Sequence, residues 1–207
     1  MAAFDIAHEP DFGLRLGGSA SPAANLPTSE IIAFHGSPYD FDRFDFTKIG
    51  TGWGAQSEGH GLYFAESEAV ARWHRDRVSR PRRVEGIVYK VRIKADPGHF
   101  LDWDRPLNEQ SELVKVGVRS IVDEVFKVSG FNVGGWDAGH FYRILIGLVG
   151  DAKDACDCLR ERGIPGIRYF DRYSLELGQG TRNCVLFNDD VEIIDRSPCL
   201  SLGALRL

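Results

Sequence analysis

The order of the predicted elements indicates an α+β fold with an antiparallel or mixed sheet. Apolar runs rich in β-branched residues stand in the first half of the chain and again near its end, and apolar residues spaced by three and four lie between them. This order of strands, helices and strands is typical of α+β proteins, whereas a doubly wound fold alternates the two. The predicted strands cover residues 30–37, 62–64, 85–95, 166–171 and 183–195.

Two of these strands end in turns that carry polar residues. The segment EIIAFHGS is an apolar strand that stops at His35-Gly36-Ser37-Pro38, so His35 is expected at a strand end. In GHGLYFAES, glycines precede the second strand, and Ser67 is expected to cap an amphipathic helix over residues 68–78. Residues 85–95 alternate apolar and polar side chains, as a half-buried antiparallel strand does.

The middle of the chain has helical spacing. Valines and isoleucines recur at intervals of three and four over residues 111–128. A second helical region covers residues 140–163, where Asp151 is a plausible N-cap and Gly163 a plausible stop. Before the first of these helices, Asp102 and Asp104 are expected to brace a turn.

Length and composition indicate one domain with two extensions. A chain of 207 residues, 43% of them hydrophobic, can bury one complete core, which we expect to span residues 31–196. Residues 1–30 are rich in Gly, Ala, Ser and Pro. They are expected to be a flexible N-terminal segment, with a delivery signal or a linker as alternatives, and residues 197–207 a C-terminal tail.

Charge and cysteine usage narrow the classes of function. A net charge of -5 and a pI near 5.7 argue against a protein that binds nucleic acid mainly by neutralising phosphates. The basic cluster at residues 72–83 is interpreted as a solvated helix end. The four cysteines, at positions 156, 158, 184 and 199, match neither a disulfide framework nor a zinc pattern, which indicates reduced thiols in a cytosolic protein.

No apolar run approaches the roughly 20 residues of a membrane span, and the N-terminus lacks the order of charges and apolar residues of a signal peptide. We therefore expect a soluble protein that does not bind membranes.

Glycines are frequent between residues 36 and 61, where they would let backbone N–H groups approach a phosphate. The run is not a Walker loop and contains no dinucleotide-binding fingerprint after a strand. His35, His60 and His74 show no metal-binding spacing such as H-E-x-x-H, so no metal is expected.

Two of these segments together resemble a known family. FHGS, followed by GHGLYFAES, is similar to the first two signature segments of the diphtheria-toxin-like ADP-ribosyltransferases, which include the poly(ADP-ribose) polymerases. The phrases FLDWDRPLNEQ and GIPGIRYFDRYS resemble the bacterial and phage branch found in polyvalent proteins and effectors. The resemblance covers residues 31–195 and implies a split antiparallel or mixed sheet with flanking helices.

The resemblance implies NAD as a substrate and a role for each matching residue. His35 would bond a ribose hydroxyl, the Gly36 backbone would pair with the nicotinamide carboxamide, and Tyr63 would stack on the nicotinamide ring. Trp73 or His74 would cover the other face of that ring, so the two strand ends would form a clamp around it. The other residues implied to contact NAD are Ser37, Gly61 and Phe64.

The third family position departs from the pattern. It is usually a glutamate on a late strand, and this chain has Asn183 there. An amide can bond a ribose hydroxyl but cannot act as a general base, so polymerisation is not expected. Glu176, with Gln179 beside it in the preceding loop, is the second choice for the missing carboxylate.

The function that the resemblance implies is NAD-dependent mono-ADP-ribosyl transfer by a toxin or effector, cytoplasmic or delivered into a host cell. The acceptor is expected to be a protein, with a nucleic acid as the alternative because of the basic cluster. An NAD glycohydrolase and a catalytically silent NAD or ADP-ribose-binding module are the other hypotheses. The sequence leaves the oligomeric state open.

Overall fold

The structure is a computed structural model that describes residues 29–50, 56–127, 132–176 and 178–198. Most of the expected flexible N-terminal segment and of the C-terminal tail lies outside these residues. The domain end predicted at residue 196 falls inside the last strand, which continues to Pro198 because it stays paired with its neighbour up to that residue.

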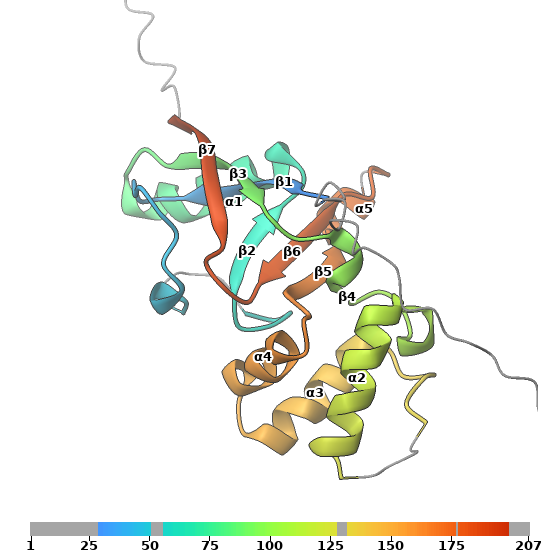
Figure 1. The fold of residues 1–207 in the computed structure, drawn as a ribbon. Coiled ribbons are helices and arrows are strands. Elements are labelled where there is room, and N and C mark those ends of the chain that lie inside the picture. Colours follow the sequence, from blue (N-terminus) through green and yellow to red (C-terminus); the bar gives the residue numbers. More distant parts are fainter. Residues whose placement is uncertain (1–28, 51–55, 128–131, 177, 199–207) are drawn as a thin grey trace, which may run out of the picture.

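The described residues form an α+β fold around one seven-stranded mixed sheet (Figure 1). The order of the strands is β4-β5-β6-β2-β1-β3-β7, and every pair is antiparallel except β4 with β5. The strands are β1 (Ile31–Ser37), β2 (Leu62–Ala65), β3 (Ile87–Ile93), β4 (Leu101–Asp102), β5 (Gly166–Phe170), β6 (Arg182–Leu186) and β7 (Val191–Pro198).

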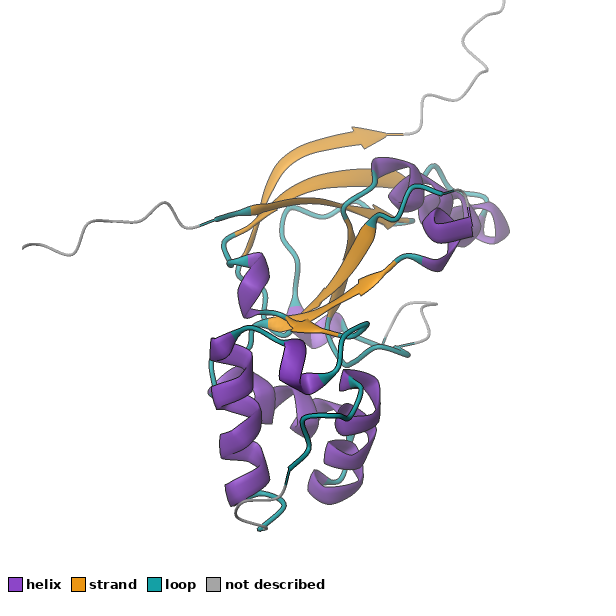
Figure 2. Cartoon of the chain, turned by 90° about the vertical axis from the view of Figure 1, so that its right-hand side faces the viewer, coloured by secondary structure: helices purple, strands orange, loops and turns teal. Residues whose placement is uncertain are grey.

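The sheet is nearly divided between β1 and β2. Seven registered pairs join β1 to β3, but Phe34 opposite Ala65 is the one pair between β1 and β2 among the described residues. Figure 2 shows the consequence, since one group of strands crosses the top of the molecule while the others descend toward the lower helices. The coarse expectation of an antiparallel or mixed sheet with flanking helices is confirmed.

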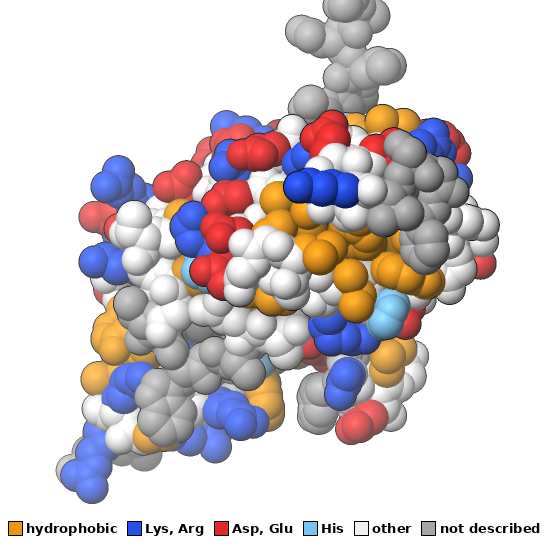
Figure 3. All heavy atoms as spheres, turned by 90° about the horizontal axis from the view of Figure 1, so that it is seen from below, with side chains coloured by type: hydrophobic (Ala, Val, Ile, Leu, Met, Phe, Trp, Pro, Cys, Tyr) orange, Lys and Arg blue, Asp and Glu red, His pale blue; other side chains and the backbone are white. Residues whose placement is uncertain are grey.

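The helices cover one face of this bent sheet, here called the helix face. Helix α1 packs on β1 and β3, while α2, α3 and α4 form a layer below β5 and β6 (Figure 1). The helices are α1 (Glu68–Ser79), α2 (Glu112–Glu124), α3 (Ala138–Val149), α4 (Ala152–Glu161) and α5 (Arg172–Glu176). Seen from below (Figure 3), apolar side chains are exposed among charged ones, and the large exposed ones on α2 and α3 are Val116, Ile144 and Leu148.

Local signals in the sequence fix several helix ends. Asp151 caps α4 by accepting a hydrogen bond from the Asp154 N–H, and Gly163, with φ +77°, follows the end of that helix. Ser67 stands at the start of α1 without a side-chain cap bond. These three positions agree with the sequence predictions. Ser67 occupies the N-cap position, but its side chain does not make the expected capping hydrogen bond.

Two hydrophobic clusters hold the sheet. The first lies between the helix face and α2, α3 and α4, and it includes Val185, Ile167 and Phe141. The second lines the opposite face, here called the inner face, where the two halves of the sheet bend toward each other, and it includes Tyr89, Phe64 and Cys184. The two faces therefore have separate cores, and alternate residues of the central strands belong to each.

Three sequence predictions change in detail. The strand predicted over residues 183–195 is divided into β6 and β7, which lie apart in the sheet. Glu176, expected in a loop, ends the short helix α5, because the Asp171 carboxylate accepts a hydrogen bond from the Ser174 N–H and starts a helical turn. Asp102 lies in β4 rather than in a turn, although it still accepts a hydrogen bond from the Asp104 N–H, and Asp104 in turn accepts one from the Phe170 N–H, so the brace is present.

Candidate functional site

The two signature segments and the third family position lie on adjacent strands. The first is on β1, the second on β2, and Asn183 is on β6, which pairs with β2 on the side away from β1. Ala65 is opposite Phe34 of β1 and opposite Asn183 of β6. Residues that are far apart in the sequence therefore meet at the centre of the sheet, next to the place where β1 and β2 diverge.

His35 is linked to the second segment by a hydrogen bond. Its Nδ1 lies 2.8 Å from the carbonyl oxygen of Tyr63, an acceptor, so Nδ1 carries the proton and Nε2 is left as an acceptor. Burial lowers the pKa of the imidazole, and this effect exceeds the opposing one of the bond to the Tyr63 carbonyl. His35 is therefore a neutral imidazole of fixed tautomer near pH 7.

The ring of His35 lies on the inner face. His35 is opposite Tyr89 on β3, and its ring packs edge-on against Phe44 and Phe64 at centroid distances of 5.2 and 5.9 Å. Phe41 is a further aromatic neighbour of this ring. Phe64, expected to contact NAD, is only 2% exposed and packs in the core beneath this histidine.

The Tyr63 side chain lies on the helix face. Its hydroxyl donates a 2.8 Å hydrogen bond to the Gly59 carbonyl, its ring packs against the first cluster, and burial raises its pKa. The expected clamp, with imidazole and phenol facing each other, is therefore wrong in its geometry. Successive side chains of a strand point to opposite faces, so the imidazole beside Phe64 cannot face the phenol of Tyr63. His35 and Tyr63 are joined by the hydrogen bond to the Tyr63 carbonyl, and their side chains lie on opposite faces of the sheet where β1 and β2 diverge.

Asn183 belongs to the same face as Tyr63 and is bonded to a buried carboxylate. Its Nδ2 donates a 2.9 Å hydrogen bond to Asp171 Oδ2, and both residues are 7% exposed. The opposite orientation of the amide would place its oxygen against the carboxylate, so the bond fixes the position of Oδ1. Oδ1 is buried and has no hydrogen-bond partner among the described residues.

Two further side chains surround this pair. Tyr169 of β5 is opposite Asn183 of β6, and burial raises the pKa of its phenol. His74 on α1 has its pKa lowered by loss of solvent, and the negative charge of Asp171 opposes this effect. Asp171 and Tyr169 were missed by the sequence reasoning. Asp171 could have been found as a helix N-cap, since it precedes Ser174 at capping distance.

The other predicted site residues have defined places. Trp73 is on α1 and about 43% exposed, with its ring 4.8 Å from that of His74. Glu176 and Gln179 are exposed after the Asp171 cap. Ser37 is buried, and its Oγ accepts a hydrogen bond from the Tyr39 N–H.

Two glycines of the signature segments are required by close packing. A Cβ atom on Gly36 would stand 2.1 Å from the Ala71 carbonyl oxygen of α1, and one on Gly61 would stand 2.5 Å from the Leu186 carbonyl oxygen. Real Cβ contacts are never this short, so any side chain at Gly36 would push α1 off the sheet. Helix α1 therefore lies directly against the backbone of the first signature segment.

Among the described residues, no group of three or more His, Cys, Asp or Glu side chains is placed to hold a metal ion. Helices α1 to α5 of the described chain are all too short or too polar to cross a membrane. Comparisons of the chain with family models, with curated proteins and with solved structures found no match.

Proposed function

We propose that this protein is an NAD-dependent mono-ADP-ribosyltransferase whose site lies where β1 and β2 diverge. The observation that carries the proposal is the convergence of the three segments on β1, β2 and β6. The sequence resemblance requires these segments to meet around one dinucleotide. The near division of the sheet at β1 and β2 also supports it, because a ligand at the split can reach side chains from both faces.

In this proposal His35 binds a ribose hydroxyl. The Nδ1–H is engaged by the Tyr63 carbonyl, so the Nε2 lone pair is the group that accepts the hydroxyl proton in a hydrogen bond. The lowered pKa keeps this lone pair available near pH 7. Gly36, held against α1, would offer its backbone to the nicotinamide carboxamide, and Trp73 or His74 of α1 would make the second aromatic contact.

Asn183 and Asp171 would stabilise the transition state as a pair. When the bond between nicotinamide nitrogen and ribose C1′ breaks, its electrons leave with nicotinamide and the ribose becomes cationic. An oriented amide oxygen and a carboxylate behind it place negative charge toward that cation without reorganising. The acceptor nucleophile then bonds to C1′ and releases its proton to water. This pair supplies the charge that Asn183 alone lacks.

The hydrolytic alternative uses the same first step, with water in place of the acceptor. The binding-module alternative has one observation in its favour, which is that Asn183 Oδ1 is buried in this structure. For turnover, the side chains that cover Asn183 Oδ1 must move when NAD binds.

The test is to incubate the purified protein with NAD labelled on the adenine ring, with and without cell lysate, and to measure nicotinamide release and label on macromolecules. We expect label on protein that is lost at least about tenfold in His35→Ala, because binding and orientation of the ribose are removed. His140→Ala is the matched control, since His140 is an exposed histidine on α3.

The outcomes separate the hypotheses. Free ADP-ribose without labelled macromolecules identifies a glycohydrolase. NAD binding measured by calorimetry, with no nicotinamide released, identifies a binding module. Absence of both binding and release in the wild-type protein would reject the site altogether.

A further inference from the structure

A second polar site lies on the inner face, behind the Asn183 pair. Arg168 of β5 is opposite Cys184 of β6, whose side chain belongs to the inner-face core, and Phe170 is opposite Arg182. The side chains of Arg168 and Arg182 thus leave the strands on the face opposite to Tyr169 and Asn183. They border a cavity of about 400 Å³, here called the arginine cavity.

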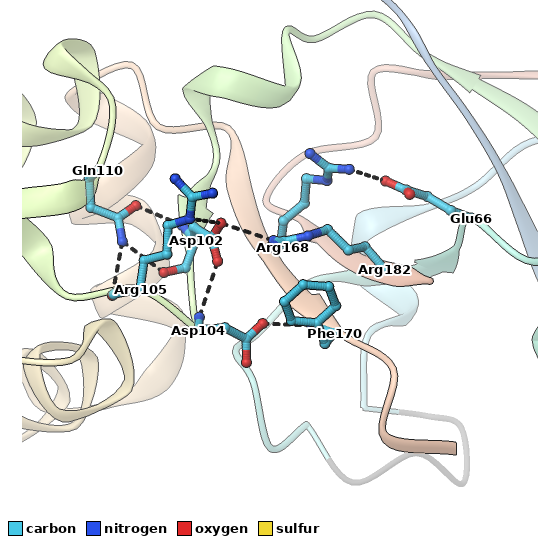
Figure 4. Close-up of polar contacts among 8 residues, drawn as sticks. All are labelled: Glu66, Asp102, Asp104, Arg105, Gln110, Arg168, Phe170 and Arg182. Carbon is cyan, nitrogen blue, oxygen red and sulfur yellow. Dashed lines mark hydrogen bonds and ion pairs between the residues drawn. The ribbon is translucent and has the colours of Figure 1, made fainter. Parts of the chain in front are cut away.

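Three guanidinium groups line the arginine cavity. Arg168 and Arg182 are diagonal neighbours on β5 and β6, and Arg105 approaches from the turn after β4. Figure 4 shows the first two side by side and Arg105 with Gln110 at the opposite side of the cluster. Phe100 adds an apolar wall.

These arginines are held in place by partners that use few of their N–H groups. Asp102 Oδ2 lies 3.0 Å from Arg182 Nη1 and 3.4 Å from Arg105 Nε, so one carboxylate is shared by two guanidinium groups. Arg168 pairs with Glu66 through Nη2 (Figure 4). The guanidinium of Arg182 also stacks on Phe170, with its carbon 4.1 Å from the ring centroid.

The wall that carries Arg105 is itself fixed. Gln110 is 5% exposed, and its side chain accepts a hydrogen bond of 2.9 Å from the Asp102 N–H. The Gln110 Nε2 donates to the carbonyl oxygens of Asp102 and Arg105 at 2.8 and 3.1 Å. The turn therefore holds its position without a ligand, which lowers the entropy cost of binding one.

We propose that the arginine cavity binds the phosphate group of a small molecule. Each guanidinium has five N–H donors in a planar fork that matches phosphate oxygens, and three such groups here share two close carboxylates. The remaining lining carboxylate, Glu109, is exposed to solvent. A doubly charged phosphate between Arg168 and Arg182 would relieve the repulsion between their neighbouring charges.

The shape and the charge favour a small phosphorylated molecule over a nucleic acid. The arginines line a hollow of limited volume with an apolar wall, and the chain as a whole carries a charge of -5. A nucleic acid would require a basic surface that follows its backbone. This proposal does not depend on the proposed function, because the arginine cavity and Asn183 lie on opposite faces of β6.

The test is calorimetric titration of the full chain with inorganic phosphate, with pyrophosphate and with AMP at low ionic strength. We expect binding of at least one of these, weakened about fivefold or more in Arg105→Gln and in Arg182→Lys, which keeps the charge but loses the fork. The Arg105 side chain is about 57% exposed, so its replacement should leave the fold intact. The matched control is Arg160→Gln, an exposed arginine paired with one carboxylate on α4.

The three ligands distinguish the sources of the phosphate. Tighter binding of AMP than of inorganic phosphate indicates a nucleotide, and the reverse order indicates free phosphate or a phosphate ester without a base; both support the cavity if the variants weaken them. Binding unchanged in both cavity variants overturns the proposal, as does binding of none of the three by the folded wild-type protein. Competition of pyrophosphate with NAD overturns the separation of the two sites.

Discussion

Arg182 and Asn183 are neighbours in the chain, yet they belong to two chemically different faces of β6. Asn183 is enclosed on the helix face and bonded to one buried carboxylate. Arg182 lines the arginine cavity on the inner face, and the same contrast holds on β5 between Tyr169 and Arg168. A single pair of strands therefore carries a buried amide–carboxylate pair on one face and a cluster of arginine side chains on the other, because side chains alternate at every residue.

Among substitutions that should affect one face of β6 and not the other, Asp171→Ala is expected to have the largest effect on stability and turnover. The replacement leaves the Ser174 N–H and the Asn183 Nδ2 without their acceptor in a buried position, which should lower the free energy of unfolding by about 3 kcal/mol. Nicotinamide release should fall at least about tenfold, since the amide of Asn183 loses its orientation. Urea denaturation and an NAD turnover assay measure the two effects.

Binding of phosphate at the arginine cavity serves as the internal control for this variant, because the folded protein should keep it. If turnover per folded molecule stays at the wild-type level in Asp171→Ala, the residue is a helix cap and nothing more.

A smaller effect on stability distinguishes glycines of the two faces. Gly36→Ala should destabilise the protein by about 2 kcal/mol, because the new methyl group collides with the backbone of α1. Gly98 borders the arginine cavity, and its Cβ would meet only Asp96 Oδ1 at 3.2 Å, so Gly98→Ala should change stability by less than about 0.5 kcal/mol. Thermal unfolding of both variants tests this order, and equal melting temperatures would contradict the close packing of α1.

The smallest effect concerns pH and the two histidines. The pKa of His35 lies below its usual value of 6.5 because of burial, so below pH 6.5 the unfolded chain binds more protons at this residue than the folded protein does. The free energy of unfolding should therefore decrease as the pH falls through 6.5, and His35→Gln should reduce that slope. Above pH 6.5, His35→Gln should change the dependence of the free energy of unfolding on pH very little.

His74 provides the comparison for this measurement. Its pKa is also lowered by loss of solvent, but the charge of Asp171 opposes the change, so His74→Gln should flatten the slope less than His35→Gln does. Urea denaturation at several pH values between 5 and 7.5, a range of about 2.5 units around the reference pKa of histidine, measures both slopes. The reverse order of the two variants would show that His35 is better solvated than its position under Phe44 implies.

Much of the fold could be predicted because its signals are local. The helices starting near Ser111 and Asp151 follow from apolar spacing and from capping residues, which act within a few residues. The strands around His35 and Tyr89 follow from apolar runs bounded by turn residues. The short helix before β6 was missed because its five residues are too few to show apolar periodicity, so the cap at Asp171 was its one local signal.

The sequence alone indicated most of the strands, the longer helices and several residues that cap them, since these depend on interactions between near neighbours. Tertiary structure decided which side chains meet. The pairing of His35 with the Tyr63 carbonyl, the placement of their rings on opposite faces and the bond between Asn183 and Asp171 depend on strand register and on the bend of the sheet. The gathering of three arginines from β5, β6 and the turn after β4 has the same origin, because long-range packing sets it.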